Sequence, residues 1–168
     1  MGAGKNVEVF SVGFFGHRRV EDPSYTEAVL EKEIRALLHR HEYVEFFLGR
    51  SGAFDLLAAS CIRRCRRRLG EAGSALVLVL PYMTAECRNG SALLEQYYDE
   101  IMICEEAEGA HYKAAHQIRN RWIVDRADLN LFYVQRERGG AYQTLCYAER
   151  VGAKYINLAK PAGDACRT

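Results

Sequence analysis

The sequence lacks any hydrophobic run long enough to cross a membrane. Its longest apolar stretch, residues 75–81, is far shorter than the roughly 20 residues that a membrane-spanning helix needs. A secretory signal is missing as well, because the apolar stretch after the N-terminus is soon interrupted by Gly16, His17 and Arg18. These absences predict a cytoplasmic protein with no membrane partner.

An excess of charge of one sign is also lacking, since 23 basic side chains face 22 acidic ones and the net charge is +1. This balance gives no overall electrostatic argument for DNA, RNA or an anionic membrane as a partner, although it leaves room for a local basic patch. The chain has 168 residues, 49% of them hydrophobic, as expected of a globular domain. We expect one domain over residues 1–168, with a core over about 7–158 and a frayed tail at 159–168.

Paired metal-ligand motifs are absent too. The six cysteines, at positions 61, 65, 87, 104, 146 and 166, include no CxxC motif, and no HxxxH motif accompanies them. Cys61 and Cys65 are one helical turn apart, but a zinc site would need two further ligands from elsewhere. Packing of small thiols along a helix is the simpler interpretation. We therefore expect reduced cysteines, no metal and no cofactor.

What the sequence does contain is an alternation of short apolar runs and amphipathic segments. The apolar runs predict strands at 7–15, 42–48, 75–80, 100–104, 129–134 and 155–158. The segments between them predict helices at 25–41, 54–69, 91–98, 112–126 and 141–151. Such alternation is typical of an α/β fold with a mostly parallel sheet and helices on both faces. Ligands of such folds bind at the carboxyl ends of the strands, where the strand order reverses.

Two of the loops that follow strands have the composition of an anion site. The first is Gly49-Arg50-Ser51-Gly52, which opens into a helix whose first turn contains Asp55. The second is Gly139-Gly140, followed by Thr144 in the first turn of the next helix. A glycine turn that enters a helix presents free backbone N–H groups and the positive end of the helix dipole. Together the two turns predict a ligand with phosphates, although Asp55 also fits a simple helix cap.

Arginines occur in three further places. Arg18 follows Gly16 and His17 after the first strand, where it fits either a phosphate contact or a solvated turn. Arg119 and Asn120 either reach into the crevice or lie on an exposed helix face, on which Arg121 and Asp125 form an i,i+4 pair. Arg63 to Arg68 include five arginines near a helix end, which fit a solvated face better than a nucleic-acid patch.

In order along the chain, these motifs resemble the SLOG superfamily, and within it small single-domain proteins of bacteria and phages. The residues that carry the resemblance are Gly16-His17-Arg18, Phe54-Asp55, Pro81-Tyr82, the run from Arg119 to Asp125, and Gly139-Gly140 with Thr144, Tyr147 and Ala148. The resemblance implies a Rossmann-like fold, a pocket for a nucleotide or nucleotide derivative, and a homodimer or higher homo-oligomer. The superfamily includes phosphoribohydrolases, molybdenum-cofactor carriers, sensor domains and a DNA-processing family.

One departure from the superfamily bears on catalysis. The phosphoribohydrolase branch has a glutamate three residues after its threonine, and here that position is Tyr147. Glu149 lies roughly 200° further around the helix, which leaves Asp55, Glu95 and Asp99 as substitute acids. Binding of a nucleotide-derived small molecule is therefore the main expectation, with a nucleotide hydrolase and a nucleic-acid-associated protein as alternatives. The expected binding residues are Gly16, His17, Arg18, Arg50, Ser51, Gly52, Asp55, Pro81, Arg119, Asn120, Gly139, Gly140 and Thr144.

Overall fold

A computed structural model describes residues 4–160. The strands are β1 (Val9–Gly16), β2 (Tyr43–Leu48), β3 (Ser74–Leu80), β4 (Glu100–Ile103), β5 (Leu129–Tyr133) and β6 (Tyr155–Asn157). The helices are α1 (Pro23–Arg40), α2 (Ala53–Leu69), α3 (Ala85–Tyr97), α4 (Tyr112–Arg126) and α5 (Gly140–Arg150), with a 3-10 turn η1 (Glu105–Ala107) before α4. Most of the tail expected at 159–168 lies outside the described residues, as does Cys166.

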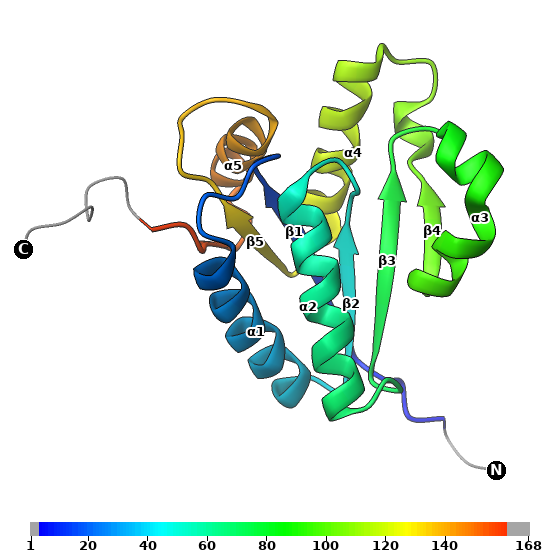
Figure 1. The fold of residues 1–168 in the computed structure, drawn as a ribbon, viewed down its shortest axis with the longest axis vertical. Helices are drawn as coiled ribbons and strands as arrows, with labels where there is room; N and C mark the ends of the chain where they lie inside the picture. The colour runs from blue at the N-terminus through cyan, green and yellow to red at the C-terminus, as the bar shows by residue number, and fades with distance from the viewer. Residues whose placement is uncertain (1–3, 161–168) are drawn as a thin grey trace, which may run out of the picture.

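The six strands form one parallel sheet in the order β4-β3-β2-β1-β5-β6 (Figure 1). Val12 of β1 is paired with Phe46 of β2 on one side and with Leu129 of β5 on the other. The chain thus moves outward from β1 to β4 and then returns to the opposite side of β1. The order reverses between β1 and β5, and the predicted parallel α/β fold is confirmed.

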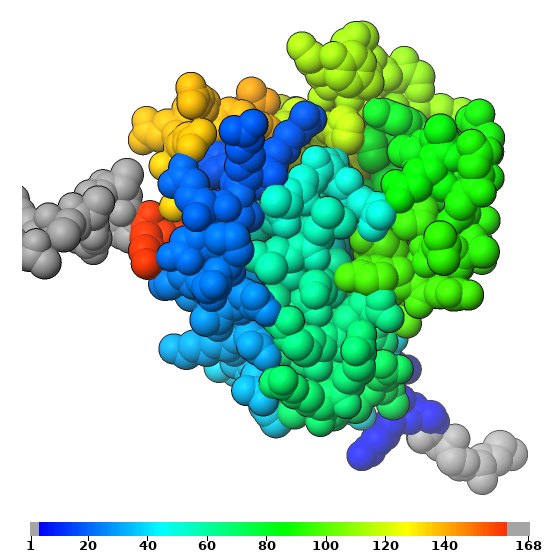
Figure 2. Space-filling view, viewed as in Figure 1, coloured from blue at the N-terminus to red at the C-terminus, as the bar shows by residue number. Residues whose placement is uncertain are grey.

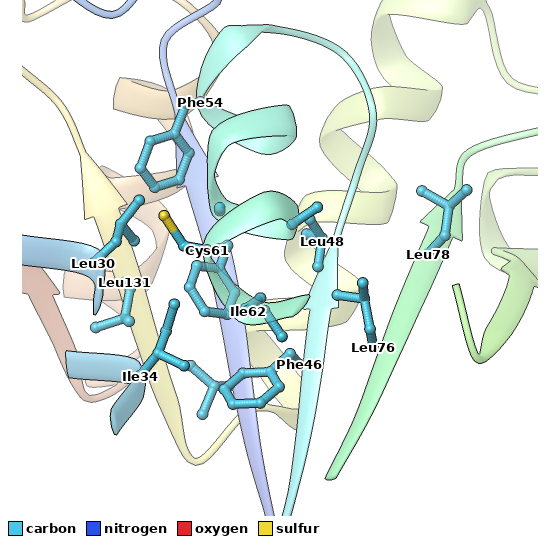
Figure 3. Close-up of a cluster of buried hydrophobic side chains, with 14 of the residues drawn as sticks. Leu30, Ile34, Phe46, Leu48, Phe54, Cys61, Ile62, Leu76, Leu78 and Leu131 are labelled. Carbon is cyan, nitrogen blue, oxygen red and sulfur yellow. The ribbon is translucent and has the colours of Figure 1, made fainter. Parts of the chain in front are cut away.

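Each face of the sheet is covered by its own set of helices. Figure 3 shows Phe54, Cys61 and Ile62 of α2 against Phe46, Leu48 and Leu76 of the sheet, and all six side chains are fully buried. The opposite face packs against α4 and α5 through a second buried cluster that includes Phe15, Phe132, Ile123 and Ala148. Because strands buried on both faces need apolar side chains at nearly every position, the strands read as continuous apolar runs.

The helix ends differ from the sequence expectation in two places. The helix α1 begins at Pro23, two residues before the expected start at 25, and Asp22 caps it, because its carboxylate accepts a hydrogen bond from the Tyr25 amide at 3.0 Å. The expected start of the next helix at 91 is wrong, since α3 begins at Ala85 behind Thr84, whose hydroxyl accepts a hydrogen bond from the Cys87 amide. Gly90 has non-helical backbone angles within α3. Gly90 therefore interrupts α3, and only the part of α3 after Gly90 matches the expected helix at 91–98.

The arginine cluster at 63–68 lies near the end of α2, away from the carboxyl ends of the strands (Figure 1). Arg66 is buried and donates to Asp99 at 2.7 Å and to the Ser74 carbonyl at 3.2 Å. Arg64 forms an ion pair with Glu27, and the Arg68 guanidinium is 3.4 Å from Glu31. Arg63 lies over the ring of Tyr97 at 4.0 Å. Most arginines of this cluster therefore bind partners within the protein, and these contacts stabilise the packing of α2.

Replacing Asp99 by asparagine is expected to destabilise the protein by about 2 kcal/mol, because hydrogen bonds to charged groups contribute about 1.5–3 kcal/mol. The Asp99 carboxylate also accepts from the Leu76 amide at 2.7 Å, and the Arg66 side chain beside it is only 8% exposed. Urea unfolding measures the loss. The matched control is Glu106→Gln, whose ion pair with Arg126 is solvent-exposed and contributes at most about 1 kcal/mol. Equal stability of the two variants would contradict this account of Arg66.

No helix among residues 4–160 combines the length and the apolar character needed to cross a membrane. The five cysteines in the described part of the chain are free thiols, and Cys61 and Cys65 are fully buried in the core under α2. Burial raises the pKa of Cys61 to about 12 and also raises the pKa of Cys65. Both thiols therefore stay protonated and act as small packing groups.

Candidate functional site

A pocket of about 350 Å³ opens at the carboxyl ends of β1 and β5, where the strand order reverses. We call it the switch-point pocket. Figure 2 shows the segments of this end meeting at the top of the molecule: the blue β1–α1 loop, the orange start of α5 and the yellow-green α4. The sequence-predicted residues that line the pocket are Gly16, His17, Arg18, Ser51, Asp55, Arg119, Asn120, Gly139 and Gly140.

The floor of the switch-point pocket contains two buried groups of opposite charge. Asp55 is 9% exposed and Arg119 is 5% exposed, and they do not form a direct ion pair. Burial raises the pKa of Asp55, although Arg119 and the Ser51 amide, which donates to the Asp55 carboxylate at 2.9 Å, counteract the shift. Burial also lowers the pKa of Arg119, while Asp55 opposes that change. The fold therefore holds two poorly solvated groups at the base of an open pocket.

Gly49 allows Arg119 to lie where it does. A Cβ atom at Gly49 would lie 2.0 Å from Nη1 of Arg119, which is closer than any real contact. This Nη1 donates to the Val79 carbonyl at 3.0 Å, and that bond fixes the guanidinium above β3. The Nε of Arg119 has no hydrogen-bond partner. One edge of the guanidinium is thus held by the protein while Nε remains unsatisfied.

The helices α2 and α5 both begin at the pocket without a side-chain cap. Gly52 precedes α2 and Gly139 precedes α5, and Gly139 has a φ angle of 89°, which strongly favours glycine. Gly52 also lets two loops meet, since a Cβ there would lie 2.6 Å from the Cα of Arg18. The first amide of α2, that of Ala53, donates to the Arg18 carbonyl at 2.9 Å, so the positive potential at this end of the sheet comes from the remaining first-turn amides and the two helix dipoles.

His17 connects the β1–α1 loop to the β5–α5 loop. Its Nε2 accepts hydrogen bonds from the amides of Gln135 at 3.0 Å and Arg136 at 3.3 Å. An imidazole can accept these bonds only while Nε2 carries no proton. Burial, with a further contribution from Arg136, lowers the pKa of His17 from 6.5, while Glu21 acts in the opposite direction. Neutral His17 thus holds the loop that carries Arg136, Arg138 and Gly139.

Replacing His17 by glutamine is expected to make stability less dependent on pH. The folded-state pKa of His17 lies below its unfolded value of 6.5, so the unfolded chain binds more protons as the pH falls. Its contribution to stability is complete well above pH 6.5 and is lost as the pH falls through the lowered folded pKa. Urea unfolding at several pH values between about 7.5 and about 5, within the range in which imidazoles titrate, measures the dependence of stability on pH.

The pKa of His116 is also lowered by burial, so His116→Gln is the matched control for the same experiment. Each variant is expected to remove its own share of the pH dependence. An unchanged slope in the His17→Gln variant would show that the two amide contacts do not depend on a neutral imidazole.

Two shallower hollows adjoin the switch-point pocket and share residues with it. The loop hollow lies between the β1–α1 and β5–α5 loops and shares His17, Arg18 and Gly139. The helix hollow lies against the start of α4 and shares Arg18 and Gly140. Together they are lined by one acidic residue, Glu21, and by five basic residues that we call the basic rim: Arg18, Arg19, Lys113, Arg136 and Arg138.

Most of the basic rim is free of acidic partners. Arg136 pairs with Glu21, but none of the ion pairs between described residues involves Arg18, Arg19, Lys113 or Arg138. Tyr112 lies beside Lys113 in the helix hollow and is 55% exposed. The pocket is therefore the centre of a wider basic surface with an exposed aromatic ring.

Several predicted residues lie elsewhere. Arg50 is bound to Glu86 at 2.9 Å and lines a different hollow beside α3. Thr144 is fully buried behind the pocket, where its hydroxyl donates to the Gly140 carbonyl and accepts from Asn120. Pro81 and Gly52 do not line the pocket. Of the three candidate acids only Asp55 lines it, because Asp99 is bound to Arg66 and Glu95 lies exposed on α3.

Sequence reasoning missed several residues that the structure brings to the site. Phe14, Phe15, Gly49 and Ala141 line the pocket beside the predicted residues. Phe14 and Phe15 directly precede Gly16, the last residue of β1, so their position near the carboxyl end of a strand could have indicated them. The predicted ion pair between Arg121 and Asp125 is absent: Asp125 accepts from the Tyr147 hydroxyl at 2.7 Å, and Arg121 lies over the Tyr147 ring.

Solved structures of two DNA processing A proteins are similar to this chain. The protein from Streptococcus pneumoniae has a TM-score of 0.67 at 16% identity, over 93% of this chain and 52% of that one. The protein from Helicobacter pylori, which is described as having a unique single-stranded DNA binding mode, has a TM-score of 0.65 at 14% identity, over 92% and 67%. This chain thus spans about half the length of the first protein. No model of a known family and no curated protein matches.

The likeness shows that the parallel sheet has a Rossmann-like fold, the fold that the sequence resemblance implied. It also corrects the main functional expectation. Binding of a nucleotide-derived small molecule, with nucleic acid kept only as an alternative, is the wrong first choice, because the similar structures are proteins of DNA processing and single-stranded DNA binding. The comparison favours the nucleic-acid alternative. The balanced net charge gave no sign of the basic rim at one end of the sheet.

Proposed function

We propose that this chain binds single-stranded nucleic acid across the carboxyl ends of its strands, as a SLOG-type Rossmann-like protein without catalytic turnover. The observation that carries the proposal is the basic rim around the switch-point pocket. Five basic side chains line the two adjoining hollows against one acidic side chain, and four of the five have no ion-pair partner among residues 4–160. Unpaired cationic side chains along connected hollows are the kind of surface that binds the phosphates of a nucleic-acid backbone.

Two further features support a strand rather than a duplex. Tyr112, exposed beside Lys113, offers a ring on which a base can stack, and stacking needs an unpaired base. The switch-point pocket is a concave site in which one nucleotide can insert, whereas paired bases cannot leave the duplex without an unstacking cost. The described single-stranded DNA binding of the Helicobacter pylori protein points to the same partner.

The phosphates would contact the rim and the uncapped helix starts. Gly139 and Gly140 present backbone amides at the start of α5, and Arg18 stands between the pocket and both hollows. Arg18 can donate two parallel hydrogen bonds to one phosphate. His17 contributes indirectly, by holding the loop of Arg136 and Arg138 in place.

Fluorescence anisotropy with a labelled 20-nucleotide single strand tests the proposal. We expect saturable binding that weakens steeply with salt, with competition by unlabelled single strand far stronger than by duplex or by mononucleotides. Absence of binding at about 50 mM salt, where such contacts are strongest, would overturn the proposal. A mononucleotide that competes as well as the strand does would overturn it too, because the rim would then add nothing.

A further inference from the structure

The switch-point pocket differs in charge from the rim that surrounds it. The rim is almost purely cationic, whereas the floor holds one buried carboxylate, Asp55, and one buried guanidinium, that of Arg119. A phosphate inserted to the floor would meet the carboxylate at close range, where like charges repel strongly in poorly solvated surroundings. Phosphates are therefore favoured on the rim, and a neutral polar group is favoured on the floor.

The two buried groups on the floor of the pocket offer opposite hydrogen-bonding functions, because one can only donate and the other, when ionised, can only accept. Arg119 is only a donor: its Nη1 is bound to the Val79 carbonyl and its unpartnered Nε is shut off from solvent, so Nη2 is the donor that remains for a ligand. Asp55 when ionised is only an acceptor, and its hydrogen bond from the Ser51 amide occupies one of about four lone-pair sites. The floor thus suits a group that has an acceptor facing Arg119 and donors facing Asp55. Phe14 and Phe15 contribute the apolar part of the lining.

We propose that the pocket receives one unpaired guanine base of the bound strand, with O6 facing Arg119 and the N1–H and N2–H donors facing Asp55. This inference rests on the proposed strand binding and adds a base preference to it. Guanine has an acceptor directly beside two adjacent donors on its Watson–Crick edge. The other bases can offer one acceptor and one donor to this pair of side chains but not the second donor.

The test uses short single strands that carry one base at a central position and are abasic at every other position, so that no neighbouring base competes for the pocket. Guanine, hypoxanthine, adenine, cytosine and an abasic residue are compared at that position by anisotropy competition. We expect the guanine strand to bind about tenfold more tightly than the abasic strand, as for a well-placed bidentate base contact. Hypoxanthine lacks the N2 amino group and is expected to bind with intermediate affinity.

The outcomes separate the inference from the proposed function. Equal affinity of all five strands within twofold, or adenine preferred over guanine, would overturn the guanine site while strand binding itself would stand. If no strand binds at all, the proposed function fails first. Because this comparison uses only the unmodified chain, it does not depend on the folding of any variant.

A variant then assigns the preference to the floor. Asp55→Asn replaces an acceptor by a donor at one position and is expected to abolish the tenfold preference for guanine over the abasic strand. Asp125→Asn is the matched control, since Asp125 is exposed on α4 and bound to Tyr147, outside the pocket. It is expected to keep the preference. A merely structural role of Asp55 would lower the affinity for every strand without changing the order of the bases, and that result would contradict the inference.

Discussion

Replacing Arg18, Lys113 and Arg138 together by glutamine is expected to weaken single-strand binding about 100-fold at 0.1 M salt, because each phosphate contact to a single strand contributes about 0.7 to the salt slope. The three side chains belong to the basic rim, and none has an acidic partner in the described part of the chain. The slope of log affinity against log salt is expected to fall by about 2. Anisotropy titrations over a salt series measure both quantities.

The control for this variant changes the same number of charges elsewhere. Arg63, Arg67 and Arg68 lie in the last part of α2, near the opposite ends of the strands from the rim. Their replacement by glutamine is expected to leave the affinity within about twofold, since screened charges more than about 10 Å from the strand contribute little. Loss of binding in the control and not in the rim variant would place the strand on α2 and contradict the account.

Phe54→Ala is expected to destabilise the fold by about 3–5 kcal/mol, the usual loss for a fully buried phenylalanine. Phe54, in the first turn of α2, is 0% exposed (Figure 3). Its ring stacks on the ring of Tyr133, with 5.8 Å between the two centroids. Its ring also lies directly against Gly16, where an added Cβ would come within 2.2 Å of Cγ. The same side chain therefore supports the core, β1 and the loop that carries Arg18.

Urea unfolding measures this loss, and thermal unfolding should show a melting temperature lower by about 6–20 °C. The matched control is Leu56→Ala, two residues along the same helix, where the side chain is 48% exposed. That change is expected to cost less than about 1 kcal/mol, because little apolar area leaves water when Leu56 packs. If both variants lose the same stability, the loss comes from α2 in general and not from the packing beneath Gly16.

The elements that sequence reasoning placed well are those whose signal is local. β2 starts within one residue of its expected start, and α4 has the same bounds as the helix expected at 112–126. Buried strands and amphipathic helices leave clear patterns in the sequence. The pocket at Gly139 and Gly140 was also predictable, since a glycine turn at the start of a helix leaves its first amides free to face a ligand. The start of α3 could not be predicted, because the sequence around Thr84 resembles a loop and the hydrogen bond from the Cys87 amide to the Thr84 hydroxyl is known only from the structure.

Asp55, Arg119 and Arg18 were all expected at the site, but the other rim residues and the burial of Arg119 could not be predicted because they depend on topology. Lys113 and Arg138 are 25 residues apart and are brought to neighbouring hollows only by the return of the chain from β4 to β5. Arg119 is a helix residue whose burial depends on Gly49, which is 70 positions earlier. The arginine cluster at 63–68 is the opposite case, because it is conspicuous in the sequence but most of its side chains bind partners within the protein.

Amide chemical-shift mapping of the ¹⁵N-labelled protein with a short single strand tests the central claim most directly, because it reports where the strand lies. The account predicts that the amides of Gly16, Gly139, Gly140 and Lys113 shift together and saturate at the affinity found by anisotropy. It would be contradicted by shifts confined to the end of α2, around residues 63–70, with the amides around the switch-point pocket unchanged.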